Sequence, residues 1–552
     1  MSQTITKTKT ITQTQTKFDD IYYLEYDNTR LTKEEEKELL KEEKNIINNY
    51  FSLSAADLLA ISGDNKRFQI IVMIIFAALG VIAAFIIYEM PFVFYEPKFM
   101  CPDTSGIMQR CEQEEYCKLD NRPELHPDKF SMTQEFNLIC ENKSVATNGK
   151  SFVFFFAGVL VMVWSVLSDK IGRLAVFYGS WIWAIKGTII SYFSTNFAFS
   201  IFGLGLAFGG VDLFYSTLFI YTNEVIGSNM RSLSNGLVFS FYGLGGVIFA
   251  LMNIAIQNYR VNFLIQFISI VVVGCGFFYI CETPFFLYKT KRIKKLYEAL
   301  KYINEQNNRK DVEKVLETNK TLKETLGIKS DRPNFLDNVD YLHIVKKKKK
   351  DGEKKVKRFP ITKAHVWRLF LLTVVMGNLY ITYGLTLLIP SKLGIDNIYI
   401  NMGLLAVSEL LGYLVITFIA HRTRRKLLNL ATVLATLAIS TILMIIKFMH
   451  YKDNFYGKIF QSALSILLKL FVAMNYSLVF TYGSELFPTK LRGLALGISV
   501  FVGRILISFC SYLESFADYE HIHPMVTSAF GAILALPCIL ILPETLNKKM
   551  SN

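Results

Sequence analysis

The chain has 552 residues and a formal net charge of +14, with 52% apolar and 14% aromatic residues. Its charged residues are concentrated between long apolar runs rather than spread through them, which predicts a membrane protein. The basic excess borders these runs, where membrane proteins keep their cytoplasmic loops, and this placement argues against a nucleic-acid partner.

The first 67 residues form an expected cytoplasmic tail. Residues 1–17 are a Thr, Gln and Lys tract without an apolar core, so we expect neither a cleavable signal peptide nor ordered structure there. Residues 32–48 are highly charged, and Thr32 followed by Glu35 is typical of a capped helix start. A short helix is therefore expected in this tail.

Twelve apolar runs follow, each near the length of about 20 residues that crosses roughly 30 Å of hydrocarbon. They are residues 68–90, 151–168, 174–194, 197–221, 233–256, 261–281, 367–389, 399–420, 427–447, 457–482, 493–515 and 524–542. We therefore predict an all-α polytopic membrane protein with two six-helix halves. The expected parts are the halves 68–284 and 367–545, a basic cytoplasmic linker 285–366, and a cytoplasmic tail 546–552.

The polar loop 91–150 separates the first two runs. It holds four of the eight cysteines, namely Cys101, Cys111, Cys117 and Cys140. An even number of cysteines in such a loop predicts two disulfides in an oxidising compartment, with three pairings open; free thiols are the alternative. The sequon Asn142-Lys143-Ser144 makes Asn142 a glycosylation candidate. Because the loop is more acidic than basic, we expect it to be extracellular.

Several charged residues recur along the chain at a nearly constant offset. They are Glu224, Arg231 and Glu282 in the first half, and Glu485, Arg492 and Glu544 lying 261 or 262 residues later. This recurrence predicts a duplicated membrane unit, of the kind in which two bundles enclose a central site reachable from either side. We expect Glu224, Arg231, Glu485 and Arg492 to form latches that break as the two halves rock.

The second run ends in the sequence Ser165-Val-Leu-Ser-Asp169-Lys170-Ile-Gly172-Arg173. Gly172 permits a tight turn between two helices, and Asp169 can accept hydrogen bonds from the start of a neighbouring helix. The segment resembles the loop signature of the major facilitator superfamily, which implies gating roles for Asp169 and Arg173. The matching loop at 421–425 keeps the charges but lacks the Asp and the Gly, so the second latch is expected to differ.

Within that superfamily, the chain resembles the organic cation, anion and carnitine transporters. The matching features are the cysteine-bearing loop, Glu224 to Arg231, Asn258-Tyr-Arg260, Glu282-Thr-Pro284, Tyr383-Gly384-Leu385, and Ser484-Glu-Leu-Phe-Pro-Thr-Lys-Leu-Arg492. The resemblance implies a twelve-helix major facilitator fold that moves small organic ions by alternating access. The alternatives are a sugar or polyol porter of the same superfamily, and a non-transporting nutrient sensor or structural membrane subunit.

Five ionisable residues stand out in the interior of apolar runs, where a charge costs several kcal/mol unless it faces a wet cavity or a partner. They are Lys186, Asp212, Glu409, Lys469 and Arg504. The resemblance implies that Glu409 handles cations and that Arg504 marks anion and carnitine carriers. An acid and a guanidinium across one cavity suit a zwitterion such as carnitine or betaine; alternatively, Glu409 and Arg504 neutralise each other.

Aromatic rings are the expected partners of a quaternary ammonium group, which has no donor hydrogens. The candidates are Tyr215, Tyr242, Tyr380 and Tyr383, of which Tyr383 stands out because it lies in the matched Tyr-Gly-Leu. Lys469 matches a lysine of the carnitine-like members and either contacts substrate or serves gating or helix packing.

Coupling and partners are less defined by the residues. Asp212 and Lys186 lie in consecutive runs and form an expected buried pair; the alternative makes Asp212 the coupling carboxylate for Na⁺ or H⁺. No metal-spaced histidine set or phosphate-cradling loop occurs, so we expect no enzyme activity, cofactor or metal site. The expected partners are the lipid bilayer and a small organic ion, bound by a monomeric unit of the plasma membrane with both termini cytoplasmic.

Overall fold

The computed structural model describes residues 59, 66–96, 99–102, 107–111, 113–119, 130–227, 230–290, 292–308, 363–388, 397–420, 422–448, 455–487, 491–519 and 524–545. The expected helix at 32–48 and most of the basic linker lie outside the described residues. The chain divides into two units, Met1–Gly63 with Lys291–Glu353, and Asp64–Thr290 with Lys354–Asn552. Helix α13 (Ile293–Gln306) belongs to the first unit, and every element described below belongs to the second.

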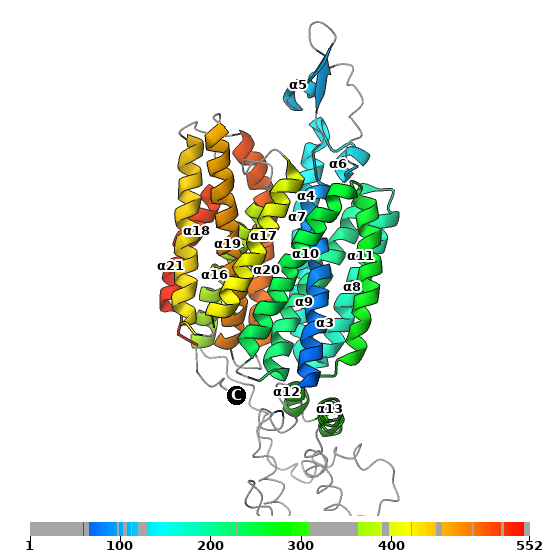
Figure 1. Ribbon diagram of the computed structural model, residues 1–552, viewed down its shortest axis with the longest axis vertical. Helices are drawn as coiled ribbons and strands as arrows, with labels where there is room; N and C mark the ends of the chain where they lie inside the picture. Colours follow the sequence, from blue (N-terminus) through cyan, green and yellow to red (C-terminus); the bar gives the residue numbers. More distant parts are fainter. Residues whose placement is uncertain are drawn as a thin grey trace, which may run out of the picture. The chain divides into compact units, whose positions relative to one another are not determined.

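The second unit is a bundle of long apolar helices (Figure 1). The first half contains α3 (Arg67–Tyr88), α4 (Met90–Val93), α7 (Lys143–Ile171), α8 (Arg173–Phe193), α9 (Phe197–Val225), α10 (Arg231–Ala255), α11 (Tyr259–Gly274) and α12 (Pro284–Lys289). The second half contains α16 (Lys363–Leu388), α17 (Ile398–Ile419), α18 (Arg425–Phe448), α19 (Phe455–Leu486), α20 (Arg492–Tyr519) and α21 (Met525–Ile541). Helices are favoured because every backbone polar group in hydrocarbon needs an internal partner.

Each of the twelve predicted runs coincides with one of these helices. In the described part of the chain, eleven helical stretches are long and apolar enough to cross a membrane, and α21 is a shorter apolar helix of 17 residues. The largest difference from the prediction is at α7, which begins at Lys143 instead of residue 151. Asn142 precedes the first helical residue, so the polar residues 143–150 are a helical extension and not loop.

A small disulfide-linked layer covers one end of the first half, which we call the disulfide end (Figure 1). Its elements are β1 (Met100–Pro102) and β2 (Met108–Arg110), which pair antiparallel, with α5 (Gln113–Cys117), α6 (Met132–Glu135) and the 3-10 turn Cys140–Asn142. The disulfides join Cys101 to Cys111 and Cys117 to Cys140. They surround a small apolar cluster of Phe99, Tyr116 and Ile139. The structure thus selects one of the three pairings that the sequence left open.

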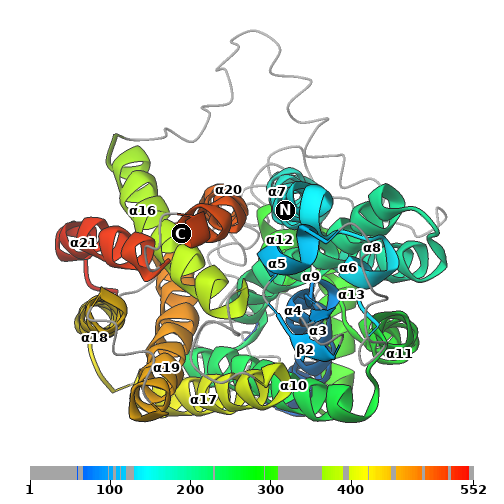
Figure 2. The same cartoon turned by 90° about the horizontal axis from the view of Figure 1, so that it is seen from above.

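The two halves meet along two pairs of helices, α7 with α20 and α10 with α17 (Figure 2). Glycines allow this close approach, as small residues do between membrane helices. A Cβ atom on Gly158 of α7 would lie 2.8 Å from the Cβ atom of Arg504 on α20. A Cβ atom on Gly243 of α10 would lie 2.7 Å from the Cα atom of Leu410 on α17. The contacts bring residues of both halves together along the middle of the bundle.

The disulfide pairing gives a direct test of the structure at the disulfide end. Non-reducing peptide mapping of the intact protein should recover Cys101 linked to Cys111 and Cys117 linked to Cys140, because each pair has Cα atoms 5.6 Å apart. Peptides that link Cys101 to Cys117 or to Cys140 would contradict this arrangement of the loop.

Candidate functional site

A buried ion pair from the second half lies near the middle of the bundle. Glu409 on α17 and Lys469 on α19 are 0% and 1% exposed, and the Lys469 Nζ atom lies 3.0 Å from the Glu409 Oε2 atom. Two tyrosine hydroxyls also hydrogen-bond to the Glu409 carboxylate. Tyr413 donates to Oε1 at 2.7 Å, and Tyr88 of α3 donates to Oε2. Tyr413 lies four residues after Glu409, a spacing that puts both side chains on one helix face.

The ammonium group of Lys469 also lies against aromatic rings. Its Nζ atom is 3.8 Å from the ring centroid of Tyr383 and 6.0 Å from that of Tyr88. The Tyr383 hydroxyl is held in turn by the Tyr242 hydroxyl, 2.8 Å away on α10. A carboxylate and ring faces therefore surround a single ammonium group, as in sites that recognise organic cations.

A second buried ion pair joins the two halves. Asp212 of α9 pairs with Arg504 of α20, and the two residues are 6% and 3% exposed. The guanidinium lies over Tyr380 and Phe208, 4.9 and 5.0 Å from their ring centroids. Among the described residues, the Asp212 Oδ2 atom and the Arg504 Nε atom have no hydrogen-bond partner. This pair is therefore held through one oxygen and one terminal nitrogen, and keeps unused hydrogen-bonding capacity.

Tyr476 of α19 links the surroundings of the two pairs. Its ring lies 6.0 Å from Tyr380, which packs on Arg504, and 5.1 Å from Tyr383, which packs on Lys469. Sequence reasoning missed Tyr476, Tyr88 and Tyr413 as site residues. Only Tyr413 had a usable signal, its four-residue spacing from Glu409, because the chain contains 28 tyrosines.

The pairing of the buried charges differs from one alternative and from one expectation drawn from the sequence. Glu409 and Arg504 do not neutralise each other, since each has its own counter-ion. Asp212 pairs with Arg504 and not with Lys186, which is exposed and lies over the Trp183 ring. Periodicity identifies apolar runs, but it does not identify which partner lies across a helix interface.

Tyr215 of α9 lies beside this cluster. Its hydroxyl donates to the Gly80 carbonyl at 3.5 Å, and its ring lies 5.7 Å from that of Tyr242. Among the predicted aromatic residues, Tyr380 and Tyr383 pack directly on Arg504 and Lys469. Tyr242 contacts Tyr383, and Tyr215 contacts Tyr242.

The end of the bundle opposite the disulfide layer, near α12, is called here the gate end (Figure 1). Hydrogen bonds and ion pairs form a second polar network there. Buried Arg173, at the start of α8, donates to Asp169 Oδ1 and to Glu224 Oε1, both at 3.1 Å. Thr283 donates to the other Glu224 oxygen at 2.6 Å. The Glu282 carboxylate accepts the backbone N–H of Arg173 at 3.0 Å and so caps α8.

Gly172 is required at this turn. Its φ angle of 114° lies in a region that L-residues rarely adopt. A Cβ atom at this position would also collide with the Glu282 carboxylate. Both the backbone conformation and the lack of space for a side chain therefore require glycine at this position of the loop signature.

The second half repeats the network with different residues. Arg425 takes the place of Arg173, and its Nε atom lies 2.7 Å from Glu485 Oε2. Thr545 donates to the same carboxylate at 2.7 Å, and Glu544 accepts the backbone N–H groups of Arg425 and Lys426, both at 3.2 Å. The loop without Asp and Gly thus forms an equivalent cap.

Glu224 and Glu485, two of the four expected latch residues, have ion-pair partners outside that set. Glu224 binds Arg173 and Glu485 binds Arg425, instead of Arg231 and Arg492 respectively. Arg492 acts electrostatically on both Glu224 and Glu485, and Arg231 acts on Glu485. Interactions at the gate end therefore run between the two halves as well as within each half.

Asn223 and Ser484 mark the axis that relates the halves. The Asn223 Nδ2 atom donates to the Ser484 Oγ atom at 2.8 Å, and the two residues are separated by 261 positions, the offset of the repeat. Equivalent residues can contact each other only close to the pseudo-twofold axis. Both side chains are buried, so the halves are in contact at the gate end in this structure.

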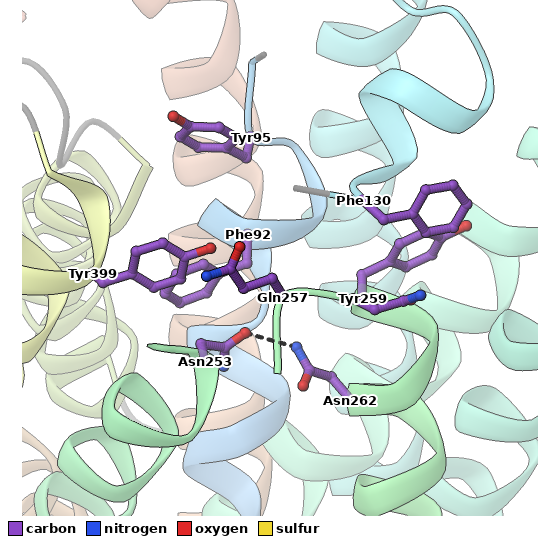
Figure 3. A pocket seen from close by; sticks show the side chains of 9 residues that line it. Phe92, Tyr95, Phe130, Asn253, Gln257, Tyr259, Asn262 and Tyr399 are labelled. Carbon is purple, nitrogen blue, oxygen red and sulfur yellow. Dashed lines mark hydrogen bonds between the residues drawn. The ribbon is translucent and has the colours of Figure 1, made fainter. Parts of the chain in front are cut away.

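Two other features of the second unit could hold a ligand or a metal ion. A small pocket at the disulfide end is lined by aromatic and amide side chains (Figure 3). Among the described residues, the candidate metal-ligand cluster is Cys101, Cys111 and Glu115, whose two cysteines form a disulfide.

Comparisons with known proteins agree with this geometry. The family model of the Major Facilitator Superfamily matches residues 143–510. Organic cation/carnitine transporter 2 of Rattus norvegicus is 24% identical over 429 residues, covering 76% of this chain and 71% of that protein. Solute carrier family 22 member 16 of Xenopus laevis is 22% identical over 440 residues, covering 76% and 70% respectively.

Among solved structures, the proton:xylose symporter XylE bound to 6-bromo-6-deoxy-D-glucose has a TM-score of 0.57 at 13% identity, covering 88% of this chain and 98% of XylE. This likeness concerns the fold alone. The proteins that the chain resembles are transporters, in agreement with the expectation that it is not an enzyme. Since the family model matches well over half of the sequence, the chain belongs to the major facilitator superfamily and is a multi-pass membrane protein.

Proposed function

We propose that this protein moves small organic ions across a membrane by alternating access, with zwitterions such as carnitine or betaine as its substrate class. The relatives named organic cation/carnitine transporters support this class. The single observation that carries the proposal is the position of the Lys469 ammonium, between the Glu409 carboxylate and the Tyr383 ring. This environment suits a substrate ammonium group equally well.

Lys469 is thus a built-in substitute for the cationic end of a substrate. A quaternary ammonium group would gain the same ring face and the same carboxylate attraction once Lys469 moves aside. Glu409 cannot be left alone, because an uncompensated buried carboxylate costs several kcal/mol. Exchange of one cation for another avoids most of that cost.

Asp212 is the corresponding substitute for the anionic end of a substrate, because it pairs with Arg504. It engages Arg504 through one oxygen, whereas a substrate carboxylate can accept two parallel hydrogen bonds from a guanidinium. A zwitterion could therefore replace both internal partners and leave the central charge balanced. A simple cation or anion would replace only one partner.

Sugar or polyol transport has less support. XylE resembles this chain in fold, but the middle of the bundle here contains two buried ion pairs that a neutral polyol would not replace. A sensor or structural subunit would bind substrate, or fail to bind it, without accelerating exchange. Substrate counterflow in proteoliposomes separates these alternatives, because only a carrier exchanges internal for external substrate.

We further propose that one chain is the transporting unit, that it resides in the plasma membrane, and that the gate end and both termini face the cytoplasm. A central site formed within a single chain supports the first point, and the two disulfides support an oxidising compartment at the disulfide end.

Exposed Asn142 should then carry a glycan. Glycosidase should lower the apparent mass of the wild-type protein but not of Asn142→Gln; labelling of the gate end from outside intact cells would refute the orientation.

The charged residues should control substrate preference. Arg504→Ala should weaken binding of a carnitine-like zwitterion by about 2–4 kcal/mol, roughly thirty- to a thousand-fold in Kd, because a charge-assisted contact is lost. Glu409→Gln should weaken ammonium compounds and spare simple carboxylates. Counterflow and direct binding with carnitine, betaine, choline, an aromatic anion and glucose provide the measurements.

Substitution of the internal partners should have the opposite effects. Lys469→Gln should strengthen binding of choline, and Asp212→Asn should strengthen binding of a simple carboxylate, since each removes a competitor. Lys186→Gln is the matched control and should change neither affinity, because Lys186 is exposed. If all four site substitutions weaken every substrate equally, the ion pairs are structural and the zwitterion proposal fails.

The gate end should open in every transport cycle. Asn223→Cys combined with Ser484→Cys should form a disulfide under oxidation, because the wild-type side chains are in contact. With a protease site inserted in the linker, the cleaved halves should stay joined on a gel until reductant is added. Transport should stop on oxidation and recover on reduction, whereas Asn223→Cys alone should be unaffected; full transport by the cross-linked protein would show that this contact does not open.

A further inference from the structure

Glu89 is a buried carboxylate outside the central site. It connects α3 to α4 and is 0% exposed. Its oxygens accept hydrogen bonds from the side-chain amides of Asn262 at 3.3 Å and Gln266 at 3.2 Å, both on α11. Among the described residues, no lysine or arginine acts on this carboxyl. Glu89 therefore differs from Glu409 and Asp212, each of which has a cation.

Burial without a cation makes the charged form costly. A carboxylate in an apolar segment is expensive unless it is paired, and two neutral amide donors replace only part of its hydration. One bound proton removes the charge. The lower-cost states of Glu89 are thus a protonated acid, or a carboxylate that is exposed to water at another stage of the cycle.

The two amides can serve either protonation state. Their nitrogens donate to the carboxylate, while Asn262 Oδ1 and Gln266 Oε1 are buried and have no hydrogen-bond partner within the described part of the chain. Rotation of one amide would present its oxygen to a protonated carboxyl, which then donates. A sodium ion would need both amides reversed and further oxygen ligands, so the arrangement fits a proton better.

The pocket at the disulfide end reaches this group through Asn262. Asn262 lines the pocket beside Asn253, and its nitrogen donates to Asn253 Oδ1 at 2.8 Å (Figure 3). The same nitrogen contacts Glu89. The Asn253–Asn262 pair therefore lies between this small pocket and the buried carboxyl.

Glu89 is also adjacent to the central site along the chain. The preceding residue, Tyr88, donates to Glu409. Glu89 lies at the junction of α3 and α4, where its backbone is helical and hydrogen-bonds to Phe85 and Val93. A change in charge at this junction can therefore bias the position of the tyrosine that contacts the substrate-binding carboxylate.

Other titratable groups on the surrounding elements are engaged elsewhere. They are Lys150 on α7 over Phe94, Tyr215 on α9, Tyr242 on α10 with Tyr383 on α16, Tyr259 and Arg260 on α11 with Glu135, and Tyr399 on α17 against Phe92. Within the described part of these elements, Glu89 is the carboxyl whose hydrogen-bond donors are both side-chain amides.

We propose that Glu89 binds a proton from the disulfide end and that this proton moves with the organic substrate in each transport cycle. The inference rests on the proposed transport function and adds its coupling ion. Uptake should rise as the pH at the disulfide end falls, since a lower pH loads Glu89. With the membrane potential held at zero, one proton per zwitterion supports about tenfold accumulation for each unit of pH difference.

Proton movement in proteoliposomes tests the proposal. Addition of substrate should change the signal of a trapped pH dye with wild-type protein. Glu89→Gln, which imitates the protonated acid, should abolish that change while substrate counterflow continues. Glu96→Gln is the matched control, because Glu96 lies on the same segment but is 53% exposed. Proton movement that survives Glu89→Gln, or that is absent from active wild-type protein, would overturn the proposal, as would Na⁺-driven uptake that Glu89→Gln abolishes.

A second measurement separates this inference from the proposed function. Infrared difference spectra of purified protein, recorded without substrate across a pH titration, should contain a protonated-carboxyl band that is lost in Glu89→Gln and kept in Glu96→Gln. Absence of the band from the wild-type protein overturns the proton site. If the band is present but no organic ion undergoes counterflow, the proposed transport function fails while the proton site stands.

Discussion

The neutralisation of four buried charges in the middle of the bundle is the constraint on which the rest of the structure depends. Asp212, Glu409, Lys469 and Arg504 come from four helices, and each has its counter-ion on another helix. Breaking such a pair by removal of one member costs about 3–5 kcal/mol, a large share of the stability of a typical domain. The helices must therefore stay in register unless another molecule supplies the missing charge.

This constraint connects binding to conformational change. A ligand shifts an equilibrium only by its differential affinity for the two states. In the proposed cycle, a zwitterion supplies that difference, because it releases Lys469 and Asp212 from their partners and allows α9 and α20, which belong to opposite halves, to separate their charges. Without substrate, Glu409 stays paired with Lys469, and Arg504 stays paired with Asp212.

The gate end shows how a duplicated sequence produces a closed contact. Glu224 and Glu485 are equivalent, yet one binds an arginine from a loop with the Asp and Gly of the signature and the other binds Arg425 from a loop without them. What the two loops share is an arginine at the helix start, a backbone cap from Glu282 or Glu544, and a threonine donor. The physical requirement is the cap, and the sequence that meets it can vary.

Much of the fold follows from the sequence because hydrocarbon imposes length and composition on each helix. The position of the costly charges was also predictable, since a lysine or a carboxylate within an apolar run needs a special reason. Their partners were not predictable. Arg504 pairs with Asp212 only because α7 and α20 bring the halves together beside α9, and this contact has no periodic signal along the chain.

The remaining errors have equally local causes. Lys186 is exposed on α8. Its place within an apolar segment of the sequence does not show whether the side chain is exposed or buried. Tyr88 and Tyr476 are two among 28 tyrosines, and their roles come from tertiary contacts. Glu89 ends an apolar run, where a carboxylate is ordinarily an interfacial residue, so its burial against α11 was missed.

The central claim is that the two internal ion pairs hold the place of a zwitterionic substrate. A structure of the protein with bound carnitine or betaine tests it most directly. We expect the ammonium group against Tyr383 within ion-pair distance of Glu409, the carboxylate bound by Arg504, and both Lys469 and Asp212 displaced from their present partners. A ligand bound elsewhere, with both ion pairs intact, would contradict the account.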